Sequence, residues 1–297
     1  MMKALIALLL IGCIFCDELL VTREYTEYLK QHVTWEVADY EENIFRGWTV
    51  ADAKNFLGTV LPRNDDMVIP NYESDIVPPA QLIWKGANCI HDVRNQGNCG
   101  SCWTFGTTGM LSDRCCLHSK DHGWLAPQEL VSCDIRNDGC QGGWPAWALQ
   151  YIIDNKGMVP ETCYKYQAQS RACPNKCDNG DDWVKAHVCN CFGLKQCLGV
   201  DTMKKCLTSG PVAVTFEVCS SFFSYRSGVY KCDCTNGGVG LHTVTAVGYA
   251  DTPECHWVVR NSWGSVWGDK GYFKMACKSC GMDGKYPNGN AMCEKVE

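Results

Sequence analysis

The chain has 297 residues, of which 46% are hydrophobic and 20% are charged, and its formal net charge at pH 7 is −6. A chain of this size can bury a sizeable core, as one domain or as two lobes. It contains no run or patch of basic residues, which argues against nucleic acid as a partner.

The N-terminus has the features of a secretory signal peptide. Residues 1–15 read MMKALIALLLIGCIF, a lysine followed by an apolar run that is too short to span a bilayer. We therefore predict a signal peptide over residues 1–16. No later apolar run is long enough to span a membrane, so we expect no membrane contact after its removal. The letters LIGC at residues 10–13 also fit a bacterial lipoprotein cleavage site, which is the alternative.

Cysteine usage fits an oxidising compartment. The chain has 23 cysteines, and the 21 that follow the predicted signal peptide all lie from Cys89 onward. Cysteines of secreted proteins are usually paired in disulfides. An odd number predicts one thiol outside the disulfide framework. If that thiol is a nucleophile, the other 20 cysteines can form ten disulfides.

Residues 17–77, here called the acidic segment, differ from the rest of the chain. They carry 13 acidic and 5 basic residues and no cysteine, whereas residues 78–297 are close to neutral. We predict a propeptide over residues 17–78 ahead of a body over residues 79–297, with a permanent N-terminal domain as the alternative. The charge suggests salt-linked docking on the body, which acidification toward pH 4 would weaken.

The acidic segment has helical spacing of its apolar residues over 23–29, 35–45 and 50–57, so we expect a helix in each range. In the third range, Thr49 is a candidate N-cap, Asp52 follows three residues later, and Gly58 is a candidate stop. Coil with prolines follows and ends in IVPPA at residues 76–80.

The body opens with QGNCGSCWTFG at residues 96–106, in which Cys99 and Cys102 are three apart. Apolar residues after Cys102 form an approximately helical stripe to residue 118. Cys102 would therefore lie in the first helical turn, where free N–H groups favour a thiolate. Half of a zinc site completed by Cys277 and Cys280, a redox pair, and a purely structural disulfide are the alternatives.

The second half of the body is rich in predicted strands. GLHTVTAVGY at residues 240–249 alternates like a strand. After a turn at residues 251–254, HWVVRNSWG at residues 256–264 is a second strand that ends in a bend. We therefore predict an α+β fold with a helical lobe and a β-rich lobe. The thiol of one lobe would face His242 of the other across a cleft.

Three stretches together resemble the papain-like cysteine proteases: QGNCGSCW at 96–103, LHTVTAVGY at 241–249 and RNSWG at 260–264. The resemblance covers residues 77–284 and is closest to the cathepsin B branch, through SDRCCLH, GCQGGWPAWA and WGDKGYFKM. HVTWEVADYEENIF in the acidic segment is similar to the short propeptide of that branch. The resemblance implies the papain-like fold, with a helical lobe and a β-barrel-like lobe.

The resemblance also implies the catalytic residues. Cys102 would be the nucleophile, because a thiolate attacks a peptide carbonyl better than a thiol does. His242 would take its proton and later protonate the leaving amine, and Asn261 would orient the imidazole. Gln96 would supply the side-chain donor of the oxyanion hole. No metal or other cofactor is implied.

Further residues of the expected substrate site follow from the same resemblance. Trp263 would cover the hydrogen bond between His242 and Asn261, and Gly142 and Gly143 would offer backbone groups to an extended substrate. Lys285 aligns with a residue that lines the second substrate pocket in relatives. The sequence departs from the family at Thr243, where alanine is usual.

The family assigns four disulfides: Cys89–Cys116, Cys99–Cys140, Cys133–Cys173 and Cys163–Cys177. The pairing of the other twelve cysteines stays open. Residues 163–177 match the position of the occluding loop of cathepsin B but lack its two histidines and its extra cysteine pair. The resemblance therefore implies a cleft that is open at both ends.

Together these features predict a cysteine endopeptidase, made as a zymogen and acting as a monomer on protein and peptide substrates. Its own propeptide would be its inhibitor. A catalytically inactive peptide-binding relative and an acyl transferase with another acceptor are the alternatives. Because the chain has no N-glycosylation sequon, secretion and delivery to an acidic lysosome or vacuole are equally open.

Overall fold

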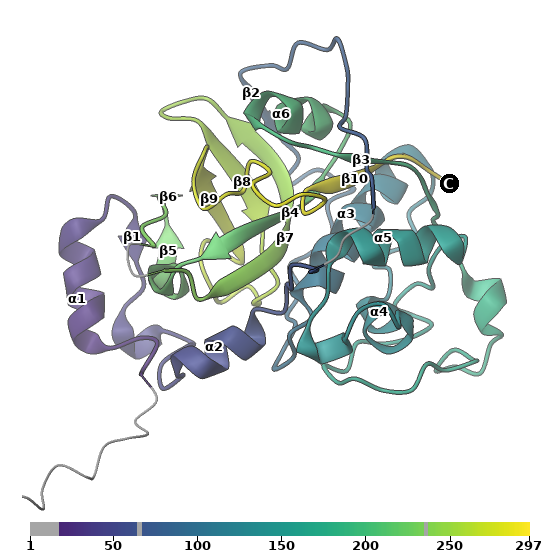
Figure 1. The fold of residues 1–297 in the computed structure, drawn as a ribbon, viewed down its shortest axis with the longest axis horizontal. Coiled ribbons are helices and arrows are strands. Elements are labelled where there is room, and N and C mark those ends of the chain that lie inside the picture. The colour runs from purple at the N-terminus through teal and green to yellow at the C-terminus, as the bar shows by residue number, and fades with distance from the viewer. Residues whose placement is uncertain (1–17, 64–66, 235–236) are drawn as a thin grey trace, which may run out of the picture.

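The computed structural model describes residues 18–63, 67–234 and 237–297. The predicted signal peptide, residues 1–16, lies outside these described residues. Helices dominate the first part of the body and a sheet dominates the second, and the two lie side by side (Figure 1). Among the described residues, no helix has the length and apolarity that a membrane crossing needs.

Along the chain, most of the α-helices come first and most of the strands follow. The α-helices are α1 Arg23–His32, α2 Val50–Phe56, α3 Cys102–His118, α4 Pro127–Cys133, α5 Pro145–Asp154 and α6 Val200–Thr208. The 3₁₀ helices are η1 Tyr40–Glu42, η2 Gly139–Gln141, η3 Trp183–Ala186 and η4 Ser220–Ser224. The strands are β1 Glu36–Val37, β2 Gln81–Ile83, β3 Cys191–Gln196, β4 Val212–Val218, β5 Tyr225–Ser227, β6 Val229–Tyr230, β7 Gly240–Ala250, β8 His256–Arg260, β9 Tyr272–Ala276 and β10 Ala291–Val296.

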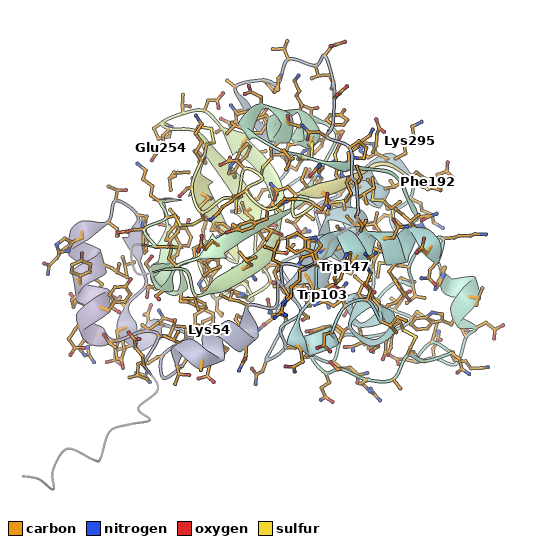
Figure 2. The ribbon with its side chains drawn as sticks, in the orientation of Figure 1. Lys54, Trp103, Trp147, Phe192, Glu254 and Lys295 are labelled. Carbon is orange, nitrogen blue, oxygen red and sulfur yellow. A yellow bond between two sulfur atoms is a disulfide. The ribbon has the colours of Figure 1, made fainter. Side chains whose placement is uncertain are left out.

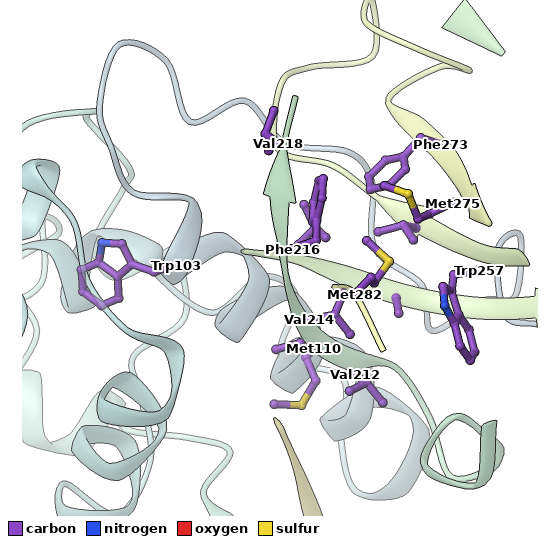
Figure 3. Close-up of a cluster of buried hydrophobic side chains, with 14 of the residues drawn as sticks. Trp103, Met110, Val212, Val214, Phe216, Val218, Trp257, Phe273, Met275 and Met282 are labelled. Carbon is purple, nitrogen blue, oxygen red and sulfur yellow. The ribbon is translucent and has the colours of Figure 1, made fainter. Parts of the chain in front are cut away.

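The main sheet has the strand order β3-β10-β4-β7-β8-β9-β6, with β2 added on β7. The predicted strands at residues 240–249 and 256–264 correspond to β7 and β8, which pair antiparallel. On the other side of β7, β4 places Phe216 opposite His242 and Thr215 opposite Thr243. Figure 3 shows the core around β4, where Phe216 lies near Phe273 and Met275. The β-rich lobe therefore holds His242 on a strand flanked on both sides.

Helix α3 is the central helix of the helical lobe and also packs against the sheet. It is buried from Cys102 to Cys115, and its Met110 lies beside Val212 and Val214 of β4 (Figure 3). It approaches β7 closely at Gly106, where an added Cβ would lie 2.6 Å from Cγ2 of Thr243. Only glycine permits this approach. The first turns of α3 are thereby held against the strand that carries His242.

In the acidic segment, two of the three expected helices are present. The ranges 23–29 and 50–57 correspond to α1 and α2, and α2 begins with a capping box between Thr49 and Asp52. The prediction of a helix over residues 35–45 was wrong. Glu36 and Val37 instead pair as β1 with β5 of the body, and only η1 is helical in this range. Pairing with another strand outweighed the local helical spacing.

The acidic segment docks on the body through aromatic rings. Phe45 packs edge-on against Phe223 and Trp263, with ring centroids 4.9 and 5.1 Å apart. Trp35 lies 5.1 Å from Tyr230. Figure 1 shows α2 of this segment at the boundary between the sheet and the helices. Buried aromatic contacts of this kind supply most of the energy of an interface.

Among the described residues of the acidic segment, the ion pairs with the body involve a few exposed groups. Much of its charge is paired internally, for example Lys30 with Asp39 at 2.8 Å. Across the interface, Arg226 lies 3.5 Å from Glu36 and 3.4 Å from Glu42, and its side chain is half exposed. Exposed ion pairs typically contribute about 0.2–1 kcal/mol. The expected salt-linked docking is therefore a minor part of the interface.

The first prediction compares these two kinds of contact in the full-length precursor. Phe45→Ala removes a buried ring, a change that typically costs about 3–5 kcal/mol, and should speed processing roughly tenfold or more at both pH 7.5 and pH 4.5. Arg226→Gln should change the rate only a few-fold, and mainly at pH 7.5. A fluorogenic peptide follows the appearance of activity. If Arg226→Gln matched Phe45→Ala, salt-linked docking would be the dominant contact after all.

Candidate active site

Cys102 is the only free cysteine among the described residues. It is fully buried and begins α3, whose N-cap residue Ser101 makes no side-chain capping bond. The free N–H groups of the first turn therefore lie at the N-terminal end of α3, the end that carries the sulfur. Figure 2 shows the next residue, Trp103, where the helical lobe meets the sheet.

The other 20 cysteines form ten disulfides in the structure. The four pairs expected from the resemblance are all present. The remaining six are Cys115–Cys189, Cys191–Cys293, Cys197–Cys206, Cys219–Cys234, Cys232–Cys280 and Cys255–Cys277. Because Cys99 pairs with Cys140 rather than Cys102, the C-x-x-C is not a redox pair. The zinc alternative loses its second pair, since Cys277 and Cys280 are both in disulfides.

His242 lies on β7. Asn261 directly follows the last residue of β8, the strand next to β7. Nε2 of His242 is 2.7 Å from Oδ1 of Asn261, which can only accept, so Nε2 carries the proton. Nδ1 is buried and has no hydrogen-bond partner among the described residues. The ring of Trp263 lies 4.8 Å from the imidazole. Nδ1 of His242 is therefore an acceptor with no donor, in an imidazole ring that Trp263 covers.

Gln96 is buried, and all its side-chain groups are engaged. Its Nε2 donates to the carbonyl of Cys99 at 2.9 Å and to the carbonyl of Phe56 at 3.1 Å. Its Oε1 accepts from Oγ of Ser262 at 2.8 Å. Ser262, which the sequence reasoning did not assign, thus fixes which end of the Gln96 amide faces the cleft. Its place in RNSWG, beside Asn261, was the available signal.

The stretch of the acidic segment after α2 passes through the cleft as extended chain. Gly143 donates its N–H to the carbonyl of Gly58 at 2.9 Å and accepts from the N–H of Val60 at 3.0 Å. Gly143 therefore pairs with the extended chain of the acidic segment by both of its backbone groups. The carbonyl of Gly142 instead accepts from the N–H of Asp138 at 2.8 Å. The cleft fits a peptide backbone.

The side chain of Thr59, in this stretch, contacts the nucleophile. Its Oγ1 is 3.1 Å from Sγ of Cys102 and 2.9 Å from Oγ1 of Thr243. Thr243 is the position at which the sequence departs from the family. The departure adds a hydroxyl to the cleft wall next to His242, and the acidic segment meets that hydroxyl with one of its own.

Burial keeps both catalytic candidates uncharged in this state. Burial raises the pKa of the Cys102 thiol above its ordinary value, although backbone N–H groups around the sulfur act in the opposite direction. Burial lowers the pKa of His242 to about 4, against the opposing effect of the hydrogen bond to Asn261. Both shifts favour the neutral forms. With the acidic segment in place, burial therefore favours a thiol and a neutral imidazole.

A buried ion pair links the nucleophile helix to the strand of Asn261. Asp113 of α3 lies 2.9 Å from Nη2 of Arg260, which directly precedes Asn261, and both side chains are almost fully buried. Nδ1 of His91 lies 2.9 Å from the same carboxylate. These contacts join the two lobes behind the cleft.

Lys285 and the loop at residues 163–177 border the site less directly. Lys285 forms an ion pair with Glu217 at 3.1 Å, and the Lys285 side chain is 58% exposed. The loop is closed by Cys163–Cys177 and tied to α4 by Cys133–Cys173. Its Tyr166 donates to the carbonyl of Gln96 at 2.7 Å. The loop thus packs beside the nucleophile stretch.

Comparison with known proteins places these residues in a family. Residues 78–287 match the papain family cysteine proteases. The chain belongs to the papain family. It is 37% identical to pro-cathepsin H of Mus musculus over 78% of this chain and 70% of that protein. It is 36% identical to cathepsin S of Bos taurus over 71% of this chain and 64% of that protein.

Solved precursor structures share the fold. Digestive procathepsin L 3 of Tenebrio molitor larval midgut has a TM-score of 0.74 at 27% identity and covers 91% of this chain and 86% of that one. Procathepsin B S9 from Trypanosoma congolense has a TM-score of 0.80 at 21% identity and covers 94% and 99%. The predicted two-lobed α+β papain-like fold is confirmed. So is the prediction of a cysteine-type endopeptidase made with a propeptide that binds its catalytic domain.

The second prediction concerns Gly58, where the backbone of the acidic segment passes close to the backbone of the body. An added Cβ would lie 1.7 Å from the carbonyl oxygen of Gly100, and overpacking of this kind typically costs about 1–3 kcal/mol. Gly58→Ala should therefore speed iodoacetamide alkylation of Cys102 in the intact precursor at pH 7 by roughly tenfold or more. Mass spectrometry of the intact precursor measures the label.

The matched control is Lys54→Ala, because Lys54 is an exposed residue of α2 (Figure 2). It should leave the alkylation rate unchanged. Equal rates for Gly58→Ala and the parent precursor would mean that residues 56–60 do not limit access to the sulfur.

Proposed function

We propose that the body hydrolyses peptide bonds within chains through a thiolate–imidazolium pair of Cys102 and His242. Departure of the acidic segment exposes the site to solvent and removes the burial that favours the neutral forms. The Cys102 proton then moves to Nδ1 of His242, the ring nitrogen that has no other partner. Asn261 keeps the second ring nitrogen protonated and the ring in position.

In the reaction, Sγ of Cys102 attacks the carbonyl carbon of the substrate. Nδ1–H of His242 protonates the departing amine, and a water that gives its proton back to Nδ1 releases the acyl group. The side-chain N–H of Gln96 and the backbone N–H of Cys102 would stabilise the oxyanion. Trp263 would limit the access of water to the hydrogen bond between His242 and Asn261.

One observation carries the assignment of the oxyanion site and the backbone groove. A peptide carbonyl, that of Phe56, already accepts a side-chain N–H of Gln96, while Gly143 pairs with Gly58 and Val60, two and four residues further along the same chain. The acidic segment thus occupies the groove with the same backbone groups that a substrate would offer. This supports roles for Gln96 and Gly143, and for Gly142 through the bend that presents Gly143.

The open cleft is supported by the loop at residues 163–177. It has no histidine to hold a C-terminal carboxylate, and its disulfides fold it back toward α4 rather than extend it. Placement in the cathepsin B branch is supported by the motifs of the sequence and by the likeness in fold to procathepsin B. The enzyme would be a branch member that cuts inside chains instead of trimming dipeptides.

Processing and destination complete the proposal. The chain would enter the secretory route by a signal peptide over residues 1–16 and lose a propeptide over residues 17–78. The body, residues 79–297, would act as a monomer, after secretion or in an acidic lysosome-like or vacuole-like compartment. The ten disulfides fit such an oxidising route.

The third prediction tests the catalytic groups. Cys102→Ser should abolish turnover, because a hydroxyl does not form an ion pair with His242, and should leave the fold and all ten disulfides intact. Gln96→Ala should lower kcat roughly 100- to 1000-fold with a smaller effect on KM, as for other lost oxyanion donors. Steady-state kinetics of the processed variants measure both. Substantial turnover by Cys102→Ser would exclude Cys102 as the nucleophile.

The fourth prediction concerns which bonds are cut. A long peptide should be cleaved at internal bonds, at equal rates with a free or an amidated C-terminus. Mass spectrometry of a timed digest measures the products. Stepwise loss of C-terminal dipeptides that depends on the free carboxylate would show that the cleft is closed at that end.

A further inference from the structure

A chain of hydroxyl groups leads from the nucleophile into the wall of the β-rich lobe. It starts at Sγ of Cys102 and continues through Oγ1 of Thr59 and Oγ1 of Thr243 to Oγ1 of Thr215. Thr243 and Thr215 are 3.0 Å apart, and Thr215 donates to the carbonyl of Gly289 at 2.9 Å. All these side chains are buried while the acidic segment is in place.

The last link fixes the direction of every hydrogen bond in this chain. A hydroxyl donates once, so Thr215, which donates to a carbonyl, accepts from Thr243. Thr243 then accepts from Thr59, and Thr59 accepts from the Cys102 thiol. Toward the cleft, therefore, Thr243 offers lone pairs and no proton.

The Thr243 hydroxyl is also held in place by packing. Its Cγ2 is directed at Gly106 of α3, at a distance that leaves no room for a Cβ there, and a β-branched side chain is stiff about χ1. Its Oγ1 therefore points toward Thr215 and the cleft. The antiparallel pairing of β4 with β7 puts Thr215 directly opposite Thr243 and fixes their separation. This arrangement belongs to the body and does not need the acidic segment.

We propose that Thr243, oriented by Thr215, is a specificity-determining residue that selects substrates with a small donor side chain, serine or threonine, beside the scissile bond. Thr59 shows that a threonine fits against this wall while its neighbours pair with Gly143. The Thr243 oxygen suits a hydroxyl donor. A valine, which has the same shape as threonine, can make no hydrogen bond to this oxygen. An aspartate carboxylate only accepts hydrogen bonds, so its oxygens and the Thr243 oxygen repel each other. The inference rests on the proposed peptide hydrolysis.

The test uses the processed enzyme and peptides that differ at a single residue. Threonine, serine, valine and aspartate are placed in turn at each of the four positions before the cleaved bond, and kcat/KM is measured for each peptide. At one position, threonine should be preferred over valine by about three- to tenfold, the value of one hydrogen bond, and aspartate should be the poorest.

Three variants assign that preference to one hydroxyl. Thr243→Val, which keeps the side-chain shape, should bring the threonine-to-valine ratio to about one, and Thr243→Ser should restore it. The matched control is Thr208→Val in α6, where the lost hydroxyl bonds only within its own helix, and it should keep the parent ratio. Concentrations of active enzyme come from stoichiometric alkylation of Cys102, so a poorly folded fraction does not alter the ratios.

Each failure has a distinct meaning. If neither the threonine nor the valine peptide is cleaved at any position, the proposed hydrolysis is wrong. If both are cleaved equally at all four positions, or if the preference survives Thr243→Val, the hydrolysis stands and the selection by Thr243 is overturned. A preference for aspartate would overturn the assigned direction of the hydroxyl chain.

Discussion

The site depends on the contact between α3 and β7, because its two reacting groups come from different lobes. Cys102 begins α3 and His242 lies on β7, so no local sequence feature brings them together. The close approach at Gly106 lets the helix settle on the strand at Thr243, the neighbour of His242. Any side chain at Gly106 would push the sulfur away from the imidazole, and a small misplacement of reacting atoms is costly in rate.

The ion pair between Asp113 and Arg260 holds the same two elements from behind. Both groups are almost fully buried, and His91 supplies a further hydrogen bond to the Asp113 carboxylate. Such a pair is weak as a source of net stability, but losing one partner leaves an unpaired buried charge at a cost of about 3–5 kcal/mol. It therefore opposes any shift of β8, and hence of Asn261, relative to α3.

The sequence was informative where a feature is local. The capping box of Thr49 and Asp52, the helix from Cys102 and the strand around His242 each follow from a short stretch, and the odd cysteine count implied one free thiol. The helix predicted over residues 35–45 was wrong because β1 forms by pairing with β5. Ser227, the partner of Glu36, lies 191 residues further along the chain. The pairing of twelve cysteines and the meeting of Thr59, Thr215 and Thr243 likewise depend on contacts between distant segments.

While the acidic segment is docked, the active site is covered, and its two reacting groups are also held toward their uncharged, less reactive forms. Cys102 and His242 are both fully buried while the acidic segment is docked, and in a buried site a thiolate and an imidazolium are costly unless they meet directly. The thiol instead donates a hydrogen bond to Thr59, which in turn donates one to Thr243. The same hydroxyl chain that satisfies the thiol thus has to lose Thr59 before the proton can reach His242. Activation therefore couples entry of water, charge separation and exposure of the Thr243 hydroxyl in one event.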